Sequence, residues 1–262
     1  MVSDYIHYRN ILFDRNIQRN YKGFDVDTNE WKKIEWVKMK PWPTPGDIMS
    51  KHYDMKLVSL AYPGSGNEQI YNKLAEYVIE NHKSIGIVVA CWTSFSRKDF
   101  AVNYERAPLG DNTKHYQTMV YNHFVDHESN KNYLNDQYDN WLTLVKLDHI
   151  YPEREVDDFY RYSIALDLIC KNYGIELVQC ASIITWPYQE SAIKYFIDHP
   201  LMPQVNRVNF YGWPIFYELG GNHLMLHGKE HCISEYDGHP TEATHKYMAN
   251  TLIDFIDQRG IL

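Results

Sequence analysis

The feature that most constrains the fold is an unbroken apolar run at residues 85–92, Ile-Gly-Ile-Val-Val-Ala-Cys-Trp. A run without alternating polar residues is typical of a strand buried on both faces, as in a parallel sheet. A second apolar stretch, at 55–61, predicts another strand, and the apolar positions of residues 68–82 recur with the period of a helix. This strand–helix–strand order predicts a βαβ unit with a right-handed crossover.

Helices and strands continue to alternate along the rest of the chain. Residues 153–173 predict a helix closed by Gly174, and residues 175–181 predict the next strand. Residues 190–198 predict a short helix, and residues 241–258 predict the last one. Alternation of this kind favours the α/β class, with a three-layer α/β/α sandwich around a mostly parallel sheet.

The length of 262 residues suits one large α/β domain, and we expect a single domain over 1–262. Residues 1–50 are polar and irregular, and a short helix is expected over 47–53. Residues 101–150 are polar, rich in Tyr and Asn, and predict an insertion that is helical in parts. Residues 200–235 show no regular pattern and are expected to be irregular.

Charge, apolar content and cysteine usage exclude several classes of function. A net charge of −8 with scattered basic residues argues against a nucleic-acid binder. The apolar runs fall well short of the ~20 residues that a membrane span needs, so no membrane partner is expected. Residues 1–20 are polar and show no signal peptide, and Cys91 and Cys180 lie in apolar runs as small hydrophobic residues. A reducing, cytoplasmic setting is therefore expected.

The 13 histidines do not indicate a metal site. No His-Glu-x-x-His motif and no zinc-like spacing of Cys and His occurs. His223, His227 and His231 recur every four residues, but Gly228 argues against a helix that would stack them. We therefore expect neither a metal nor a cofactor.

Two segments place polar groups where predicted strands end, which is the edge of a parallel sheet where ligands bind. Pro63-Gly64-Ser65-Gly66-Asn67 follows the first strand, and its glycines let backbone N–H groups face a cavity and stabilise an oxyanion. Residues 92–97 follow the next strand and supply hydroxyl groups and an Arg that can donate to a substrate oxygen. The alternatives are an ordinary strand-to-helix turn and a helix cap with a solvated Arg.

A third segment, Asp237-Gly238-His239-Pro240, opens the final helix, with His245 in its first turns. A carboxylate two residues before a histidine can orient the ring as a general base toward a hydroxyl nucleophile. The alternative is a surface turn, in which Asp-Gly makes the bend and His-Pro begins the helix.

Taken together and in order, the three segments resemble the SGNH (GDSL-type) hydrolase family, which has a flavodoxin-like three-layer fold. The resemblance covers residues 45–100 and 175–258, and implies that the Gly64 N–H and Ser94 bind the oxyanion. Ser94 stands where the family has the Asn of a Gly-x-Asn block. Asn67 completes a turn similar to the Gly-Ser-Ser-Asn form of phage and bacterial members, and is implied to lie beside the oxyanion. Asp237 and His239 match the family's Asp and His with one residue less between them.

The family's first block, Gly-Asp-Ser, supplies the serine nucleophile and is absent from this sequence. The nearest strand-like stretch is 11–16, where Arg15 stands in the nucleophile's place. Either the chain has lost the nucleophile, or the sequence begins inside a longer gene, or another residue has taken over. The nucleophile is therefore unknown.

Three functions remain open. The first is an SGNH-like esterase or deacylase that transfers an acyl group to water, with a small-molecule or carbohydrate ester such as an O-acetylated sugar as substrate. The second is a catalytically inactive SGNH-fold binding or structural protein, in a virion if the chain is phage-encoded. The third is a flavodoxin-like nucleotide or phosphate binder, for which no recognisable nucleotide contact is present. The many aromatic residues fit either a core or a sugar-binding surface, and the sequence specifies no oligomeric state.

Overall fold

The structure is a computed structural model. It describes residues 22–25, 30–33, 42–61, 65–95, 97–101, 116–120, 153–182, 190–225, 231–234 and 237–262. Residues 1–21 and most of the predicted 101–150 insertion lie outside the described residues. The packing divides the chain into two compact units, of which the first comprises residues 1–63 and 225–258 and the second comprises 64–224 and 259–262.

The second unit is built on a parallel sheet of β3 (Ile87–Trp92), β6 (Glu176–Ala181) and β7 (Phe210–Tyr211), in the order β3-β6-β7. The β3 and β6 strands pair in register from Ile87 opposite Glu176 to Trp92 opposite Ala181. The apolar runs that predicted β3 and β6 therefore do form parallel strands. Residues 177–181 of β6 are all buried, whereas in β3 buried residues alternate with partly buried ones, so β3 is not buried on both faces as predicted. The mixed α/β class is confirmed at this level.

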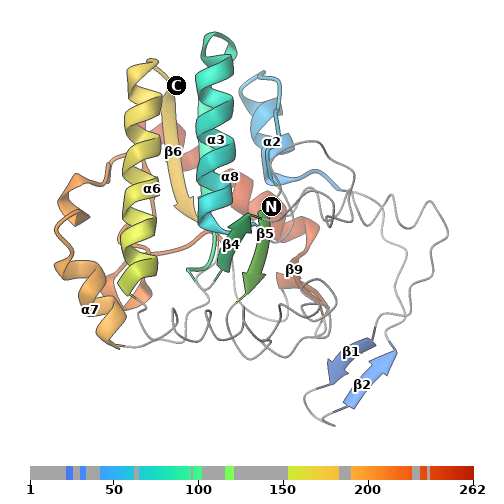
Figure 1. Cartoon of the computed structure of the whole chain (residues 1–262). Helices are drawn as coiled ribbons and strands as arrows, with labels where there is room; N and C mark the ends of the chain where they lie inside the picture. The colour runs from blue at the N-terminus through green and yellow to red at the C-terminus, as the bar shows by residue number, and fades with distance from the viewer. Residues whose placement is uncertain are drawn as a thin grey trace. The chain divides into compact units, whose positions relative to one another are not determined.

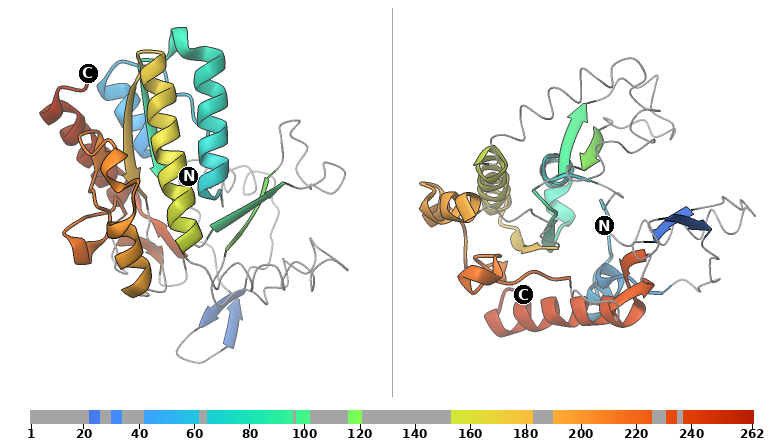
Figure 2. Two further views of the ribbon diagram at one scale, coloured as in Figure 1. Left: turned by 60° about the vertical axis from the view of Figure 1, so that its left-hand side comes forward. Right: turned by 90° about the horizontal axis from the view of Figure 1, so that it is seen from below.

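Helices α3 (Asn67–Asn81) and α6 (Glu153–Asn172) lie side by side on one face of this sheet (Figures 1 and 2). A shorter helix, α7 (Glu190–Asp198), packs against α6. The second unit also contains three single turns of 3₁₀ helix among its described residues: η1 (His82–Ser84) after α3, and η4 (Met202–Gln204) and η5 (Tyr217–Leu219) after α7. The predicted ranges of α3, α6 and α7 agree with the structure to within about one residue.

The end of α6 explains how the chain passes from helix to strand. Gly174 has a φ of +67°, its N–H bonds to the Lys171 carbonyl, and the Ile175 N–H bonds to the Cys170 carbonyl at 2.9 Å. These two bonds satisfy carbonyls that have no partner within the helix and turn the chain directly into β6. The predicted closure of this helix at Gly174 is confirmed.

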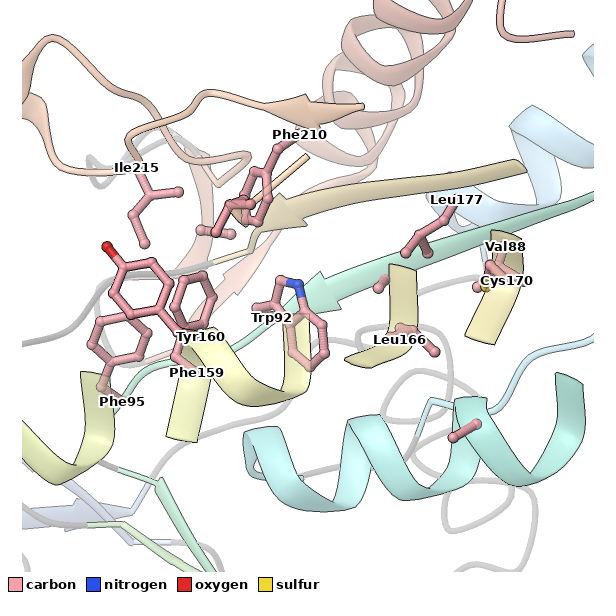
Figure 3. Packing of buried hydrophobic residues seen from close by; sticks show 14 of the residues in the cluster. Val88, Trp92, Phe95, Phe159, Tyr160, Leu166, Cys170, Leu177, Phe210 and Ile215 are labelled. Atoms are coloured by element: carbon pink, nitrogen blue, oxygen red, sulfur yellow. The ribbon is translucent and has the colours of Figure 1, made fainter. Parts of the chain in front are cut away.

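The core of the second unit is aromatic (Figure 3). Phe159 of α6 is at its centre, with its ring centroid 6.1 Å from that of Trp92 and 6.2 Å from that of Phe210. One polar side chain, Gln179 of β6, is buried beside this cluster. Its Oε1 accepts hydrogen bonds at 2.8 Å from Trp92 Nε1 and from Ser163 Oγ, which satisfies both buried donors.

The first unit contains α2 (Pro45–His52), α8 (Glu242–Arg259) and two antiparallel pairs, β1 (Lys22–Asp25) with β2 (Glu30–Lys33) and β8 (Cys232–Ser234) with β9 (Asp237–Pro240). A reciprocal cap between Thr44 and Asp47 begins α2. The Tyr53 hydroxyl, just after α2, donates to Asp257 of α8 at 2.9 Å. Among the described residues, no helix combines the length and apolarity that crossing a membrane requires.

Two predictions at element level were wrong. Residues 55–61, the predicted first strand, form no ladder with any described strand, and Met55, Leu57 and Val58 are exposed. An apolar stretch becomes a strand only where a neighbour pairs with its backbone, and the pattern alone cannot supply that neighbour. Conversely, β7 lies in the stretch expected to be irregular. Strand β4 (Arg97–Ala101) pairs with β5 (Tyr116–Val120), which lies in the predicted 101–150 insertion. The rest of that insertion lies outside the described residues, so its expected helical parts stay a prediction.

Candidate functional site

Polar side chains gather where the strands of the parallel sheet end, and they are nearly all buried. Six such residues of the second unit are at most 8% exposed: Ser65, Asn67, Gln69, Thr93, Ser94 and Ser182. They come from the start of α3 and from the residues directly after β3 and β6. Ligands of open parallel sheets bind beyond this edge, so we take this polar cluster as the candidate site.

The side-chain amide of Asn67 joins the two segments that the sequence matched to the oxyanion blocks. The Thr93 N–H donates to Asn67 Oδ1 at 2.8 Å, and Asn67 Nδ2 donates to the Thr93 carbonyl at 3.2 Å. The side chain thus pairs with the main chain of Thr93 as a neighbouring strand would. It positions the backbone of Thr93 and Ser94 relative to the first turn of α3.

The start of α3 is therefore held at the tip of β3. Gly66 is the N-cap and has no side chain to cap the helix, while its carbonyl accepts the first intrahelical bond from Ile70 at 3.1 Å. The first N–H groups of a helix and its dipole favour negative charge at this end. The predicted site residue Ser94, 1% exposed, lies just beyond Thr93.

Arg97 and Ser182 connect the same segments through backbone atoms. Arg97 Nη1 donates to the Ser65 carbonyl at 3.4 Å, and the Arg97 N–H donates to the Ser94 carbonyl at 3.2 Å. The N–H and the hydroxyl of Ser182 both donate to the Trp92 carbonyl, at 2.7 and 2.8 Å. The strand ends are thus tied together by polar groups, which fixes the shape of this edge.

The structure brings together two of the predicted site residues, Asn67 and Ser94. Gly64 lies outside the described residues. Asp237 and His239 lie in β9 of the first unit, where the backbone is described and the side chains are not. The convergence of all five residues on one site stays a prediction.

His245 is a buried histidine in the second turn of α8. It is fully buried, and neither ring nitrogen has a hydrogen-bond partner among the described residues. Its ring meets the Trp42 ring edge-on, with centroids 6.1 Å apart. Burial lowers the pKa of His245 to about 4, against the opposing effect of the Pro43 carbonyl and Asp47. His245 is therefore neutral at neutral pH and is part of the packing of the first unit.

An Asp–His pair that the sequence did not predict links α6 to the end of α7. His199 Nε2 lies 2.9 Å from Asp157 Oδ1, and the Leu201 N–H donates to His199 Nδ1 at 3.1 Å. Because Nδ1 accepts, Nε2 carries the proton and donates to Asp157, so both ring nitrogens are used. The Tyr195 hydroxyl also donates to Asp157, at 2.7 Å. This pair is structural, since neither nitrogen is left to act as a base, and no local pattern in the sequence indicates it.

The described part of the chain holds no group of three or more His, Cys, Asp or Glu side chains that could bind a metal ion. Comparison with known proteins finds no matching family model, no curated relative and no similar solved structure. A function for this chain therefore has to be inferred from its motifs and its geometry.

Proposed function

We propose that this protein is an SGNH-like ester hydrolase that transfers an acyl group to water. The observation that carries the proposal is the pairing of Asn67 with Thr93, which holds together the two segments that resemble the family's oxyanion blocks. These segments are 26 residues apart in the chain and meet at the sheet edge where acyl-transfer sites of this fold would lie.

The proposed fold is the flavodoxin-like three-layer sandwich of that family. In such a sheet the strand order is 2-1-3-4-5, so its last three strands are neighbours in chain order. The order β3-β6-β7 agrees with those last three strands. The packing of α3 and α6 on one face agrees with one of the two helical layers.

The proposed chemistry assigns the oxyanion to the Gly64 N–H and the Ser94 hydroxyl. Donors held in a buried site stabilise developing negative charge strongly, because they do not have to reorganise during the reaction. Asn67 is assigned a positioning role, since its amide already pairs with Thr93. His239 acts as general base, oriented by Asp237, and the nucleophile is not assigned.

The proposed substrate is an acyl ester of a small molecule or carbohydrate, such as an O-acetylated sugar. The proposed setting is cytoplasmic, and the free thiols of Cys91, Cys170 and Cys180 support a reducing compartment. Without a serine nucleophile, a triad of this kind loses roughly six orders of magnitude in rate. We therefore expect slow turnover unless another nucleophile serves.

A second candidate is a catalytically inactive SGNH-like binding or structural protein. It is favoured by one observation, the absence of Gly-Asp-Ser from the sequence. Both candidates use the same fold and the same sheet edge, so they differ only in whether an acyl group is transferred.

Hydrolysis of p-nitrophenyl acetate by the folded chain, measured against heat-denatured protein, tests the proposal. We expect turnover above the denatured control, together with labelling by a fluorophosphonate probe if a serine serves as nucleophile. Rates equal to the denatured control, with no labelling, would reject the hydrolase and leave the binding protein.

A further inference from the structure

Two thiols lie next to each other in the parallel sheet of the second unit. Cys91 of β3 and Cys180 of β6 are register partners, so their side chains leave the sheet on the same face. Their sulfur atoms are 3.4 Å apart. The Cys180 thiol donates toward Cys91 or toward the Ala90 carbonyl, at 3.8 Å. The register of the two strands therefore brings two thiols together as a dithiol. The sequence does not indicate this pair, because each cysteine lies in an apolar run.

The dithiol lies on the face of the sheet opposite to α6. The neighbouring residue Trp92 contacts Phe159 of α6, and successive side chains of a strand point to opposite faces. Cys180 is fully buried, whereas Cys91 is only partly so. Cys91 is thus the less buried residue of the pair.

The pKa shifts of the two thiols also distinguish Cys91 from Cys180. The Cys180 thiol, by donating toward Cys91, lowers the pKa of Cys91 against the opposing effect of burial. The same contact and burial raise the pKa of Cys180. The thiolate, which is the reactive form of cysteine, is therefore favoured at Cys91.

The backbone geometry permits a bond between the two sulfurs. Neighbouring strands are ~4.8 Å apart, within the ~4.4–6.8 Å that separates the Cα atoms of a disulfide. The sulfurs, now 3.4 Å apart, would have to approach to ~2.05 Å, which side-chain rotation can supply.

We propose that Cys91 and Cys180 are an oxidation site, at which a hydroperoxide converts the dithiol into a disulfide between β3 and β6. The Cys91 thiolate attacks the terminal peroxide oxygen, the O–O bond breaks, and Cys91 becomes a sulfenic acid. The other oxygen leaves as an alkoxide, or as hydroxide from hydrogen peroxide, and takes up the proton that the Cys91 thiol lost. The Cys180 sulfur then attacks the Cys91 sulfur and displaces its hydroxyl group, which leaves as water with the Cys180 proton. With hydrogen peroxide, two thiols and one peroxide give one disulfide and two waters.

The new bond would lie directly beneath the candidate site. Thr93 follows Cys91 by two residues, and Ser182 follows Cys180 by two residues. Oxidation therefore locks together the two strand ends that carry these polar residues. This inference stands whether or not the chain hydrolyses esters.

Peptide mapping of the folded, reduced protein after hydrogen peroxide treatment and alkylation tests the proposal. Each cysteine falls in its own tryptic peptide: Cys91 in 84–97, Cys170 in 162–171, Cys180 in 172–194 and Cys232 in 230–246. We expect 84–97 and 172–194 to appear as one linked species that lacks two hydrogens. The matched control is Cys170, a buried thiol whose pKa burial raises to about 12, and its peptide should remain alkylated.

Two variants separate the steps of the reaction. Cys180→Ser should leave Cys91 as a sulfenic acid that dimedone traps, and Cys170→Ser should leave the linked species unchanged. A peroxide-treated protein whose 84–97 peptide is still fully alkylated, or is linked to 162–171 or 230–246 instead, would overturn the proposal. If Cys180→Ser does not fold, the peptide map of the peroxide-treated wild-type protein tests the proposal by itself.

Discussion

The side chain of Asn67 and the main chain of Thr93 exchange two hydrogen bonds, one in each direction, at the end of the parallel sheet. Asn67 is the first residue of α3, and Thr93 is the first residue after β3. A single side chain thus fixes the position of a helix start relative to a strand end. The geometry of the candidate oxyanion site depends on this contact.

Replacing Asn67 with Ala should destabilise the protein by about 2 kcal/mol. The variant loses two buried hydrogen bonds and leaves the N–H and carbonyl of Thr93 without that partner. Urea unfolding of both proteins measures the change. Glu80→Ala, at an exposed position near the other end of α3, is the control and should change stability by less than about 0.5 kcal/mol. Equal stability of Asn67→Ala and the wild type would show that the pairing contributes nothing.

Replacing Gln179 with Leu should cost about 3 kcal/mol, because the indole N–H of Trp92 and the hydroxyl of Ser163 both lose their buried acceptor. Chemical denaturation measures the loss. Adding Ser163→Ala to Gln179→Leu should recover part of it, because one orphaned donor is then removed. If the double variant is instead less stable than Gln179→Leu alone, the network does not work as described.

Acid should destabilise the protein in part through His245. Its pKa is about 4 in the folded state, below the ordinary 6.5, so between these values the unfolded chain binds the proton more tightly. This contribution is full above pH ~6.5 and is lost as the pH falls toward ~4, a change on the order of 2–3 kcal/mol. Stability measured across this range for the wild type and His245→Met should show the extra slope in the wild type alone. Parallel curves for the two proteins would contradict it.

Two glycines with positive φ should differ sharply when replaced by Ala. Gly174 has a φ of +67° and open space around the position of a Cβ, so Gly174→Ala should cost about 1 kcal/mol. Gly212 has a φ of +75°, and a Cβ there would overlap the carbonyl of Asn222. Gly212→Ala should therefore cost several kcal/mol or prevent folding, and thermal unfolding compares the two. Similar melting temperatures for both variants would refute the crowding at Gly212.

Apolar patterns in the sequence predicted the longer helices and the strands of the parallel sheet other than β7. The ranges predicted for α3, β3, α6, β6 and α8 lie within about two residues of the observed ones. In the three helices the apolar residues repeat with the helical period, whereas the two strands were predicted from continuous apolar runs. The 55–61 stretch failed because a strand also needs a partner, and β7 was missed because two residues form no pattern.

For the candidate site, the sequence predicted which segments lie at the sheet edge but not the contacts between their side chains. Strand ends indicated the segments of Asn67 and Ser94, since parallel strands end at one edge. The direction of the Asn67 amide, the contact of Asp157 with His199 across 42 residues and the meeting of Cys91 with Cys180 are tertiary relationships. None of them leaves a periodic or spacing signal in the sequence.

The most direct test of the proposed function is the kcat/KM of His239→Ala for p-nitrophenyl acetate. The control is His82→Ala, because His82 precedes β3 at the opposite end of the sheet, where its ring stacks on Tyr173. A general base contributes about 10²–10⁴-fold, so His239→Ala should lose at least a hundredfold while His82→Ala retains the wild-type rate. Equal rates for His239→Ala and the wild type would contradict the assignment of this protein as an ester hydrolase of the SGNH type.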